Sequence, residues 1–378
     1  MSALESVKKV VDSAVAPHAS RNDKEGRFPQ EAVAALGAAG LLGLTVPTAL
    51  GGLGEGPRAF AGVVAALAEH DPSVAMIYVM HVCGTATMLT APKSATISAM
   101  IKDVAAGKHL STLAFSERGS RSHFWAPVSK AQKDGNGVSI SASKSWVTSA
   151  DHADSYIVSA LSHAGKGPTD STLYAVPKGA AGMKTSGAWD GMGLRSNASG
   201  PMALEGVKVA DDQRVTDEGA GFKAMLEVVL PFFNVGQTAM SLGICRAVTG
   251  ASVSHLKSST FEHLGASLGE ALPTLRNALA GMQMDTDALS AFLDDVLGHM
   301  EKPGPATMLR VLESKAYGGE TAVRVTSAAM RACGGAAFSK HTSIERFFRD
   351  AHASTVMAPT ADVLREFIGK ALLGIPLF

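Results

Sequence analysis

A polar stretch between residues 113 and 149 carries side chains suited to holding a flat, anionic cofactor. It opens with LAFSERGSRS (113–122) and closes with SKSWVTS (143–149). The first segment offers hydroxyl and backbone N–H donors on a Gly- and Ser-rich loop, a combination that suits an anionic group. The second segment places an aromatic side chain where it could cover a planar ring. The pattern predicts a cofactor site between these two segments.

The segments before this stretch are predicted to be helical, and we expect them to hold the cofactor site in place. Apolar residues recur at i, i+3 and i+4 between residues 28 and 40, and a loop rich in Pro and Gly follows over 46–56. Two further helices are predicted over 57–71 and 72–89. The second is apolar almost all round, which indicates burial between other helices. We therefore expect residues 1–110 to form an N-terminal α-helical domain.

The periodicity changes to two over residues 111–215, the predicted central β-domain. Short alternating runs there are separated by turns: GVSISASKSWVTSA, DSYIVSAL, STLYAVP and GPMALEGVKVA. Regular short strands of this kind favour a small β-barrel or sandwich. Residues 216–378 return to helical periodicity and predict a C-terminal four-helix bundle, with helices over 221–256, 268–300, 307–333 and 362–374. Pro231 is expected to start or kink the first of them. The predicted fold class is α+β.

Length, charge and cysteine content narrow the class of protein. A chain of 378 residues is expected to hold two or three domains. Lys and Arg total 34, as do Asp and Glu, so bulk charge favours neither a nucleic acid nor a membrane partner. Three scattered cysteines without metal-ligand spacing indicate no metal site and a cytoplasmic location. The N-terminus lacks the apolar region of a secretory signal, and we expect no membrane-spanning run.

Six motifs, in order along the chain, resemble those of the acyl-CoA dehydrogenase family, a flavoprotein family that also contains flavin-dependent monooxygenases. They are FPQEAVAALGAAGLLGLTVPTALGGLG, LAFSERGSRS (the family's TEP-x-x-GS loop), KSWVTSADHADSYIV, GMGLRSNAS, CGGAAF and RFFRDAHASTVMAPT. One such motif would be weak, but the series covers nearly the whole chain. The resemblance implies a three-domain protein that binds FAD rather than FMN and forms a homodimer or homotetramer.

The resemblance implies flavin contacts from the central domain. Phe115 and Ser116 would present backbone and hydroxyl groups to the edge of the flavin ring, and Ser122 would contact the pyrophosphate. Trp146 would lie against the isoalloxazine face, and Thr148 would hydrogen-bond near N5 and tune the ring. The alternatives are a buried strand aromatic for Trp146 and a plain turn serine for Ser122.

Further contacts are implied from the C-terminal helices. Gly334, Gly335 and Thr360 match family positions next to FAD. The family's pyrophosphate-binding Arg, which acts on a neighbouring subunit, is replaced here by Ser258, whereas a family Gln is replaced by Arg331. We hypothesise that Arg331 supplies the missing cation, because charge-assisted bonds to phosphate are strong. The alternative for Arg331 is a solvated residue at a helix end.

Four residues are implied to lie near the substrate. Arg195 and Ser196 match a hairpin close to the CoA arm, although a plain surface hairpin is the alternative. Phe233 and Asn234 match the part of the long helix that carries the base, or the Arg after it, in some family members. The expected substrate is a small molecule of the acyl-CoA type.

The catalytic Glu of most family members falls at Ala358, and residues 232–234 offer no carboxylate either. General base catalysis contributes about 10²–10⁴-fold, so ordinary α,β-dehydrogenation is not expected to be fast. His123 is the first candidate replacement, because it adjoins the flavin loop. His81 is the second, with a satisfied core histidine as its alternative. Glu227 and His352 are the two further candidates.

Three functions remain open from the sequence. The first is a flavoenzyme that acts on an acyl-CoA-like thioester and passes electrons to an electron-transfer flavoprotein. The second is an oxygenase of the same fold, which would use O₂ and reduced flavin supplied by a flavin reductase. The third is a catalytically silent scaffold that holds flavin or CoA. The loss of the Glu at position 358 is compatible with all three.

Overall fold

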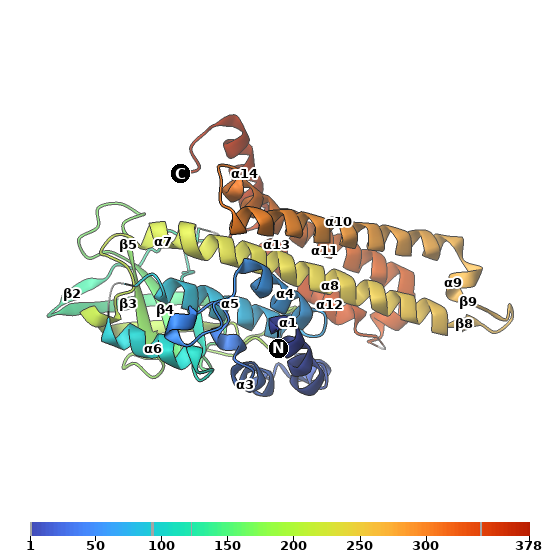
Figure 1. Ribbon diagram of the computed structural model, residues 1–378, viewed down its shortest axis with the longest axis horizontal. Coiled ribbons are helices and arrows are strands. Elements are labelled where there is room, and N and C mark those ends of the chain that lie inside the picture. The colour runs from blue at the N-terminus through green and yellow to red at the C-terminus, as the bar shows by residue number, and fades with distance from the viewer. Residues whose placement is uncertain (1, 92–93, 122, 341) are drawn as a thin grey trace.

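The computed structural model describes residues 2–91, 94–121, 123–340 and 342–378 and places a small β domain at one end of an elongated helical body (Figure 1). The N-terminal part is helical, as expected. Its helices are α1 (Ala3–Val10), α2 (Ala19–Glu25), α3 (Gln30–Ala38), α4 (Pro57–Ala68), α5 (Pro72–Met88) and α6 (Ala95–Ala105). Every residue of α5 is buried, which confirms the prediction drawn from its all-round apolar sequence.

The β domain consists of two sheets. One has the strand order β1–β4–β5, and the other has β2–β3–β7–β6. The strands are β1 (Ser111–Ala114), β2 (Gln132–Asp134), β3 (Gly137–Val147), β4 (Ser155–Leu161), β5 (Ser171–Pro177), β6 (Met183–Thr185) and β7 (Gly200–Ala210). The four long predicted strands are confirmed. The other three were missed, because β1, β2 and β6 are only three or four residues long and show no readable alternation.

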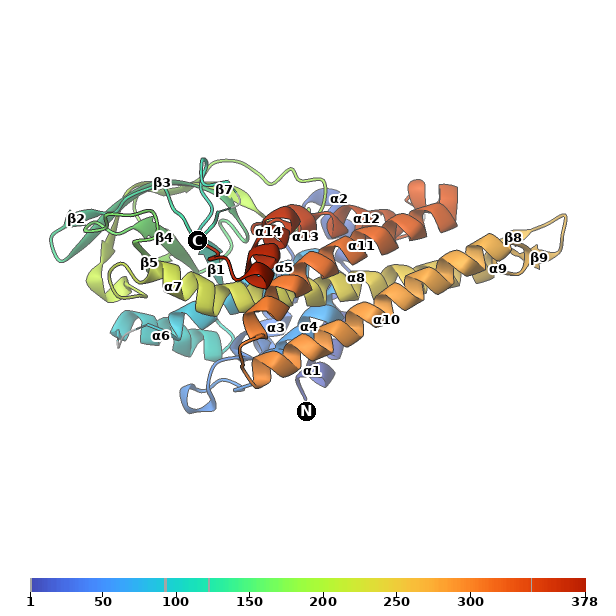
Figure 2. The same ribbon diagram turned by 90° about the horizontal axis from the view of Figure 1, so that it is seen from above.

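The C-terminal part is helical. It contains α7 (Gly221–Ala224), a π-helical turn (Met225–Val229), α8 (Leu230–Ser258), the hairpin β8 (Thr260–Phe261) and β9 (Ala266–Ser267), α9 (Leu268–Ala271), α10 (Pro273–Glu301), α11 (Thr307–Phe338), α12 (Ile344–Ala351), α13 (Ala353–Val356) and α14 (Ala361–Leu373). Pro231 lies just after the π-helical turn in a continuous helical segment, so the predicted start or kink falls where the helix changes from π to α. Figure 2 shows α8, α10 and α11 side by side.

The segment Gly221–Ser258 is long and apolar enough to span a membrane by length and composition, which the sequence analysis did not anticipate. In the structure, 83% of its most apolar window is buried inside the molecule. It packs against α4, α5, α10 and α11. The helix therefore serves as the central core helix of the C-terminal part.

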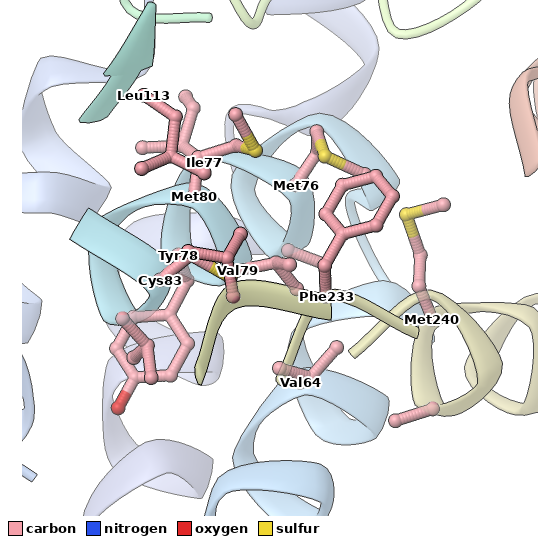
Figure 3. Packing of buried hydrophobic residues seen from close by; sticks show 14 of the residues in the cluster. Val64, Met76, Ile77, Tyr78, Val79, Met80, Cys83, Leu113, Phe233 and Met240 are labelled. Atoms are coloured by element: carbon pink, nitrogen blue, oxygen red, sulfur yellow. The ribbon is translucent and has the colours of Figure 1, made fainter. Parts of the chain in front are cut away.

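A shared core joins the β domain to the helices. Figure 3 shows Met80 of α5, Leu113 of β1 and Phe233 of α8 pointing into one apolar cluster. α5 packs against β1 on one side and α8 on the other. Burial of such side chains contributes about 1.5–3 kcal/mol each. This packing fixes the start of α8 beneath the flavin loop predicted from the sequence.

Candidate active site

A cavity of about 1040 Å³ opens between the β domain, α5, α8 and the segment from α12 to α13. It slightly exceeds the usual range for a small-molecule site, so it offers space for a large cofactor together with part of a second ligand. Its floor is apolar and includes Met80, Leu113, Phe124, Val229 and Phe233. Polar side chains are concentrated on the side of the β domain.

Four of the predicted flavin-binding residues line this cavity together, namely Phe115, Ser116, Trp146 and Thr148. Trp146 is 60% exposed although it lies in a cavity, and its ring meets Trp189 edge-on with centroids 5.2 Å apart. The Thr148 hydroxyl is 3.1 Å from the Ser199 hydroxyl. An accessible indole beside a pair of hydroxyl groups fits a planar heterocycle with polar edges. The residues present therefore fit an isoalloxazine ring.

The remaining predicted cofactor contacts lie elsewhere. Ser122 lies outside the described residues. Arg331, Gly334 and Gly335 are exposed at the end of α11 and are absent from the described cavity lining. Thr360 is the N-cap of α14, where its hydroxyl accepts a hydrogen bond from the Val363 N–H. Within a single copy of the chain, the α11 residues do not reach the cavity, so their flavin role stays a prediction that requires a second copy.

Of the predicted substrate residues, Phe233 alone is in the described cavity lining. The next residue, Asn234, is buried, and its Nδ2 donates to the Val311 carbonyl at 3.3 Å. Arg195 donates to the carbonyls of Asp23 and Gly191 at 2.9 and 3.4 Å, and Ser196 is buried beside it. These contacts engage Arg195 in joining the β domain to α2.

His81 requires a correction, because its contacts leave no atom free to act as a base. The Ser111 N–H donates to Nδ1 at 3.0 Å, so the protonated Nε2 donates to the Leu42 carbonyl at 2.9 Å. Burial lowers the pKa of His81 to about 4. His81 is therefore a satisfied core histidine that connects α5 to β1, which is the alternative stated above.

His123 also requires a correction. Its ring stacks on Trp125 with centroids 4.8 Å apart, and Trp125 packs in turn against Phe378 near the C-terminus. His123 is exposed and is absent from the described lining of the cavity, whereas the next residue, Phe124, lines it. Proximity to the flavin loop in sequence therefore does not bring the imidazole of His123 into the site.

His352 lies in the cavity lining. Its Nδ1 is 2.7 Å from the Phe348 carbonyl, which can only accept, so Nδ1 carries the hydrogen. Nε2 then keeps its lone pair and has no hydrogen-bond partner among the residues described. Glu227 lies outside the lining and pairs with Lys223 at 3.9 Å. Of the four candidate bases considered, His352 is the one that the structure brings to the cavity.

Glu117 is the carboxylate in the described lining, but it is fully engaged. Its Oε1 is 2.6 Å from the Lys144 Nζ, and its Oε2 accepts from the Ser129 N–H and hydroxyl at 2.9 and 2.7 Å. Both members of the ion pair are buried, and desolvation lowers the pKa of Lys144. Lys144 also donates to the Ser159 carbonyl at 2.6 Å. The pair fixes the flavin loop to β3 and β4.

Lys315 is a residue that the sequence analysis missed. From α11, its Nζ donates to the carbonyls of Ser354, Met357 and Pro359 at 3.0, 3.0 and 2.7 Å. It has no carboxylate partner among the described residues, and burial lowers its pKa to about 7. These three bonds hold the segment that contains Ala358 against α11. A single Lys on a mostly apolar helix face is the signal that could have indicated such a role.

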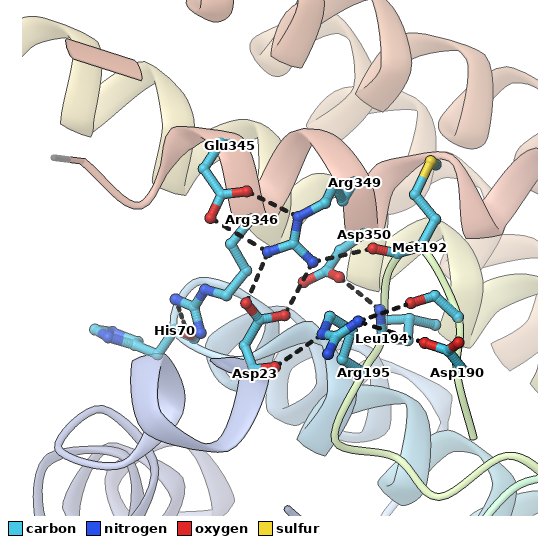
Figure 4. A network of polar contacts seen from close by, with 11 residues as sticks. Asp23, His70, Asp190, Met192, Leu194, Arg195, Glu345, Arg346, Arg349 and Asp350 are labelled. Carbon is cyan, nitrogen blue, oxygen red and sulfur yellow. Dashed lines mark hydrogen bonds and ion pairs between the residues drawn. The ribbon is translucent and has the colours of Figure 1, made fainter. Parts of the chain in front are cut away.

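A polar network holds the opposite wall of the cavity (Figure 4). The Arg349 guanidinium pairs with Asp23 at 2.7 Å and with Glu345 at 2.8 Å, and it donates to the Met192 carbonyl at 3.0 Å. The buried Asp350 accepts from the Leu194 N–H at 2.6 Å, and desolvation raises its pKa to about 7. The network joins α2, α12 and the loop that carries Trp189.

Comparison with known proteins matches the three parts of the chain in order. The family models described as acyl-CoA dehydrogenase N-terminal, middle and C-terminal domains match residues 2–108, 112–207 and 219–373. The described residues contain no group of three or more His, Cys, Asp or Glu that could hold a metal ion.

Individual proteins extend the likeness over almost the full length. The probable acyl-CoA dehydrogenase fadE25 of Mycobacterium leprae is 25% identical over 97% of this chain and 93% of its own. The probable acyl-CoA dehydrogenase YngJ of Bacillus subtilis is 25% identical over 98% and 96%. The structure of butyryl-CoA dehydrogenase from Megasphaera elsdenii aligns with a TM-score of 0.91 at 23% identity, over 98% and 97%. The helical, β and helical order predicted from the sequence is confirmed.

Proposed function

The chain belongs to the acyl-CoA dehydrogenase family, and from this premise we propose an FAD-dependent oxidoreductase that acts on an acyl thioester without a carboxylate base at position 358. One observation carries the proposal. Trp146 and Thr148 share a single cavity with Ala358, and the carboxylate in its described lining, Glu117, is bound to Lys144. These observations support a cavity with a surface suited to a flavin and without the acid–base group of most family members.

The chain's own residues would orient the cofactor. Trp146 would cover one face of the ring, while the Thr148 hydroxyl and the Ser116 side chain would lie at its polar edges. Bound FAD would supply two-electron oxidation–reduction. Thr148 is buried and already 3.1 Å from Ser199, so its hydroxyl is held in place before any ligand arrives. Because this hydroxyl is already ordered, less side-chain entropy is lost when a ligand binds.

The apolar floor of the cavity would accept the acyl chain. Met80, Leu113 and Phe233 come from three different elements that are packed in one core. Burying an acyl chain there would contribute about 0.8 kcal/mol per methylene. It would also exclude water from the reacting carbons. The rigid packing of α5 against β1 and α8 fixes the depth of this floor.

A relocated base is available in the same cavity. His352 would accept the α-proton of the acyl group at Nε2, because Nδ1 already donates to the Phe348 carbonyl. A histidine whose other nitrogen is fixed by a carbonyl has a defined tautomer. Imidazole is also the most common general base in enzymes. The proposal therefore replaces a carboxylate at position 358 with an imidazole at position 352.

The test is a spectral titration of the FAD-loaded protein, without oxygen, against acyl-CoAs of increasing chain length. Loss of the flavin absorbance with one class of acyl-CoA is the expected result. If wild-type protein binds FAD but no acyl-CoA in the panel changes its spectrum, thioester oxidation is the wrong function. Apoprotein that binds no flavin would overturn the flavoenzyme assignment as a whole.

The second candidate is the oxygenase that uses reduced flavin and O₂. It is favoured by the same feature, a cavity whose described lining has no free carboxylate. Its test supplies reduced flavin from a reductase together with oxygen, and product analysis then looks for an inserted oxygen atom. The two candidates also differ in partner, since thioester oxidation needs an acceptor such as an electron-transfer flavoprotein.

We also propose a homo-oligomer. Phe338 is 81% exposed at the end of α11, next to the exposed Gly334 and Gly335. An aromatic side chain left in solvent beside predicted cofactor contacts suits an interface with a second copy. Size measurement in solution distinguishes a dimer or tetramer from a monomer.

A further inference from the structure

Two positively charged side chains at the cavity have no ion-pair partner among the residues that the structure describes. The Asp, Glu, Lys and Arg residues of the described cavity lining are Glu117, Arg118, Arg121 and Arg349. Glu117 is paired with Lys144, and Arg349 is paired with both Asp23 and Glu345. Arg118 and Arg121 are exposed and make no ion pair or side-chain hydrogen bond within the described part of the chain. The available charge of the cavity is therefore positive.

The two arginines lie on the loop predicted to approach the cofactor. The backbone N–H of Arg118 bonds to the Ser143 carbonyl at 3.4 Å, which connects the loop to the strand that carries Trp146. Arg121 has a left-handed backbone with φ of 55°, and Gly119 between the two arginines has φ of 104°. The loop thus folds back on itself and brings both side chains to the same cavity.

Both positions depart from the family's TEP-x-x-GS pattern, in which Pro and Gly stand where this chain has Arg118 and Arg121. Neither of those residues carries a charge. An anion close to two guanidinium groups that have no described anionic partner is favoured electrostatically. Guanidinium groups match the oxygens of a phosphate geometrically and bind them by paired hydrogen bonds.

We propose that Arg118 and Arg121 form a diphosphate-binding subsite at the cavity, which supplies within one chain the cation missing at Ser258. The inference rests on the proposed function, because that function brings two diphosphate ligands to this cavity, FAD and a CoA thioester. The proposal assigns the missing positive charge to Arg118 and Arg121, which line the cavity. Arg331, in contrast, is absent from the described cavity lining of a single copy. The shared ligand chemistry is the diphosphate ester of a nucleotide.

The experiment compares ligands with and without phosphate. Apoprotein is titrated with FAD and with riboflavin, and FAD-loaded protein is titrated with an acyl-CoA and with the matching acyl-pantetheine. The variants are Arg118→Gln, Arg121→Gln and the double variant, read out by flavin fluorescence and by calorimetry. Lys133→Gln is the matched control, since Lys133 is exposed in the same domain but outside the described lining.

The expected result is a loss of affinity confined to the phosphate-bearing ligand. Each single variant should weaken it about threefold to tenfold, and the loss should shrink as ionic strength rises because the groups are exposed. A loss for FAD but not riboflavin identifies the flavin as the source. A loss for acyl-CoA but not acyl-pantetheine identifies CoA. Arg→Lys variants should retain part of the affinity.

Two outcomes would overturn the inference. One is unchanged affinity of the double variant for both FAD and acyl-CoA. The other is an equal loss for the phosphate-free ligands, which would mean that the arginines only support the loop. Failure of the proposed function is seen separately, since wild-type protein would then show no spectral response to any acyl-CoA whatever the variants do.

Discussion

Lys315 donates a hydrogen bond to the Pro359 carbonyl at 2.7 Å, which ties the middle of α11 to the residue that directly follows Ala358. The segment that contains Ala358 is thus held by the buried side chain of Lys315. The Lys315 Nζ lies 5.9 Å from the centroid of the Phe233 ring. One side chain thereby supports two walls of the cavity.

The first prediction concerns Lys315→Met, which keeps most of the apolar part of the side chain but removes its donors. Three carbonyls, of Ser354, Met357 and Pro359, would lose their partner. We expect the free energy of unfolding to fall by about 2–4 kcal/mol, because buried acceptors without partners are costly. Denaturant unfolding measures this change. Lys133→Met is the surface control and should change stability by less than about 0.5 kcal/mol.

The same residue predicts a pH dependence of stability. Burial lowers the pKa of Lys315 from 10.5 to about 7. Between these values the unfolded chain holds a proton that the folded chain releases, so the Lys315 contribution to stability rises with pH over that window. Below about pH 7 both states hold the proton and the contribution is constant. Lys315→Met should flatten this part of the stability profile, and an unchanged profile would contradict the assignment.

A second prediction concerns the buried pair of Glu117 and Lys144, whose charged atoms are 2.6 Å apart. Lys144→Met alone leaves the Glu117 carboxylate buried and unpaired, which should lower the free energy of unfolding by about 3–5 kcal/mol. The double variant Glu117→Gln, Lys144→Met should recover part of this loss. A double-mutant cycle in denaturant measures the coupling, and additive single losses would contradict it.

Local motifs explain which parts of the site could be predicted. Trp146 lies near the end of β3 and Thr148 directly follows the last residue of that strand, so their shared position in the cavity follows from the sequence around them. Lys315 could not be predicted in this way. Its acceptors are backbone carbonyls 39–44 residues away along the chain. Because every residue has a backbone carbonyl, the amino-acid sequence does not mark which residues will accept these hydrogen bonds.

The two histidine corrections have the same physical origin. His81 is fixed by the backbone groups of Leu42 and Ser111, which belong to elements distant in sequence. His123 turns toward Trp125, whose position depends on the C-terminal Phe378. The element order of the fold was predictable, because it depends on local periodicity. The direction of each side chain depends on packing between elements.

A third prediction tests His352. His352→Gln removes the accepting Nε2 but keeps a polar side chain of similar size. We expect kcat to fall by about 10²–10⁴-fold while FAD affinity stays within about twofold of wild type. Unchanged kcat would rule out His352 as the base.

A fourth prediction concerns Arg331, which the sequence analysis proposed as a phosphate contact. Because Arg331 is exposed and lies outside the described cavity lining, it can reach a flavin only in another copy of the chain. Arg331→Ala should therefore weaken FAD retention in the oligomer and leave the dissociated monomer unaffected. Gel filtration with absorbance at the flavin wavelength measures both quantities. Equal retention in the oligomer would contradict the hypothesis.

The last prediction restores a carboxylate. In Ala358→Glu the new side chain would enter the cavity that also holds Trp146 and Phe233. If the acyl thioester binds as the family membership suggests, the Glu should remove the α-proton, and α,β-dehydrogenation with an artificial electron acceptor should rise at least about tenfold. The gain should persist in a His352→Gln background, because the new carboxylate does not depend on the imidazole. Ala358→Gln is the matched control, since it fills the same space without a base. A gain in both variants would point to improved packing, and no gain in either would place the thioester away from position 358.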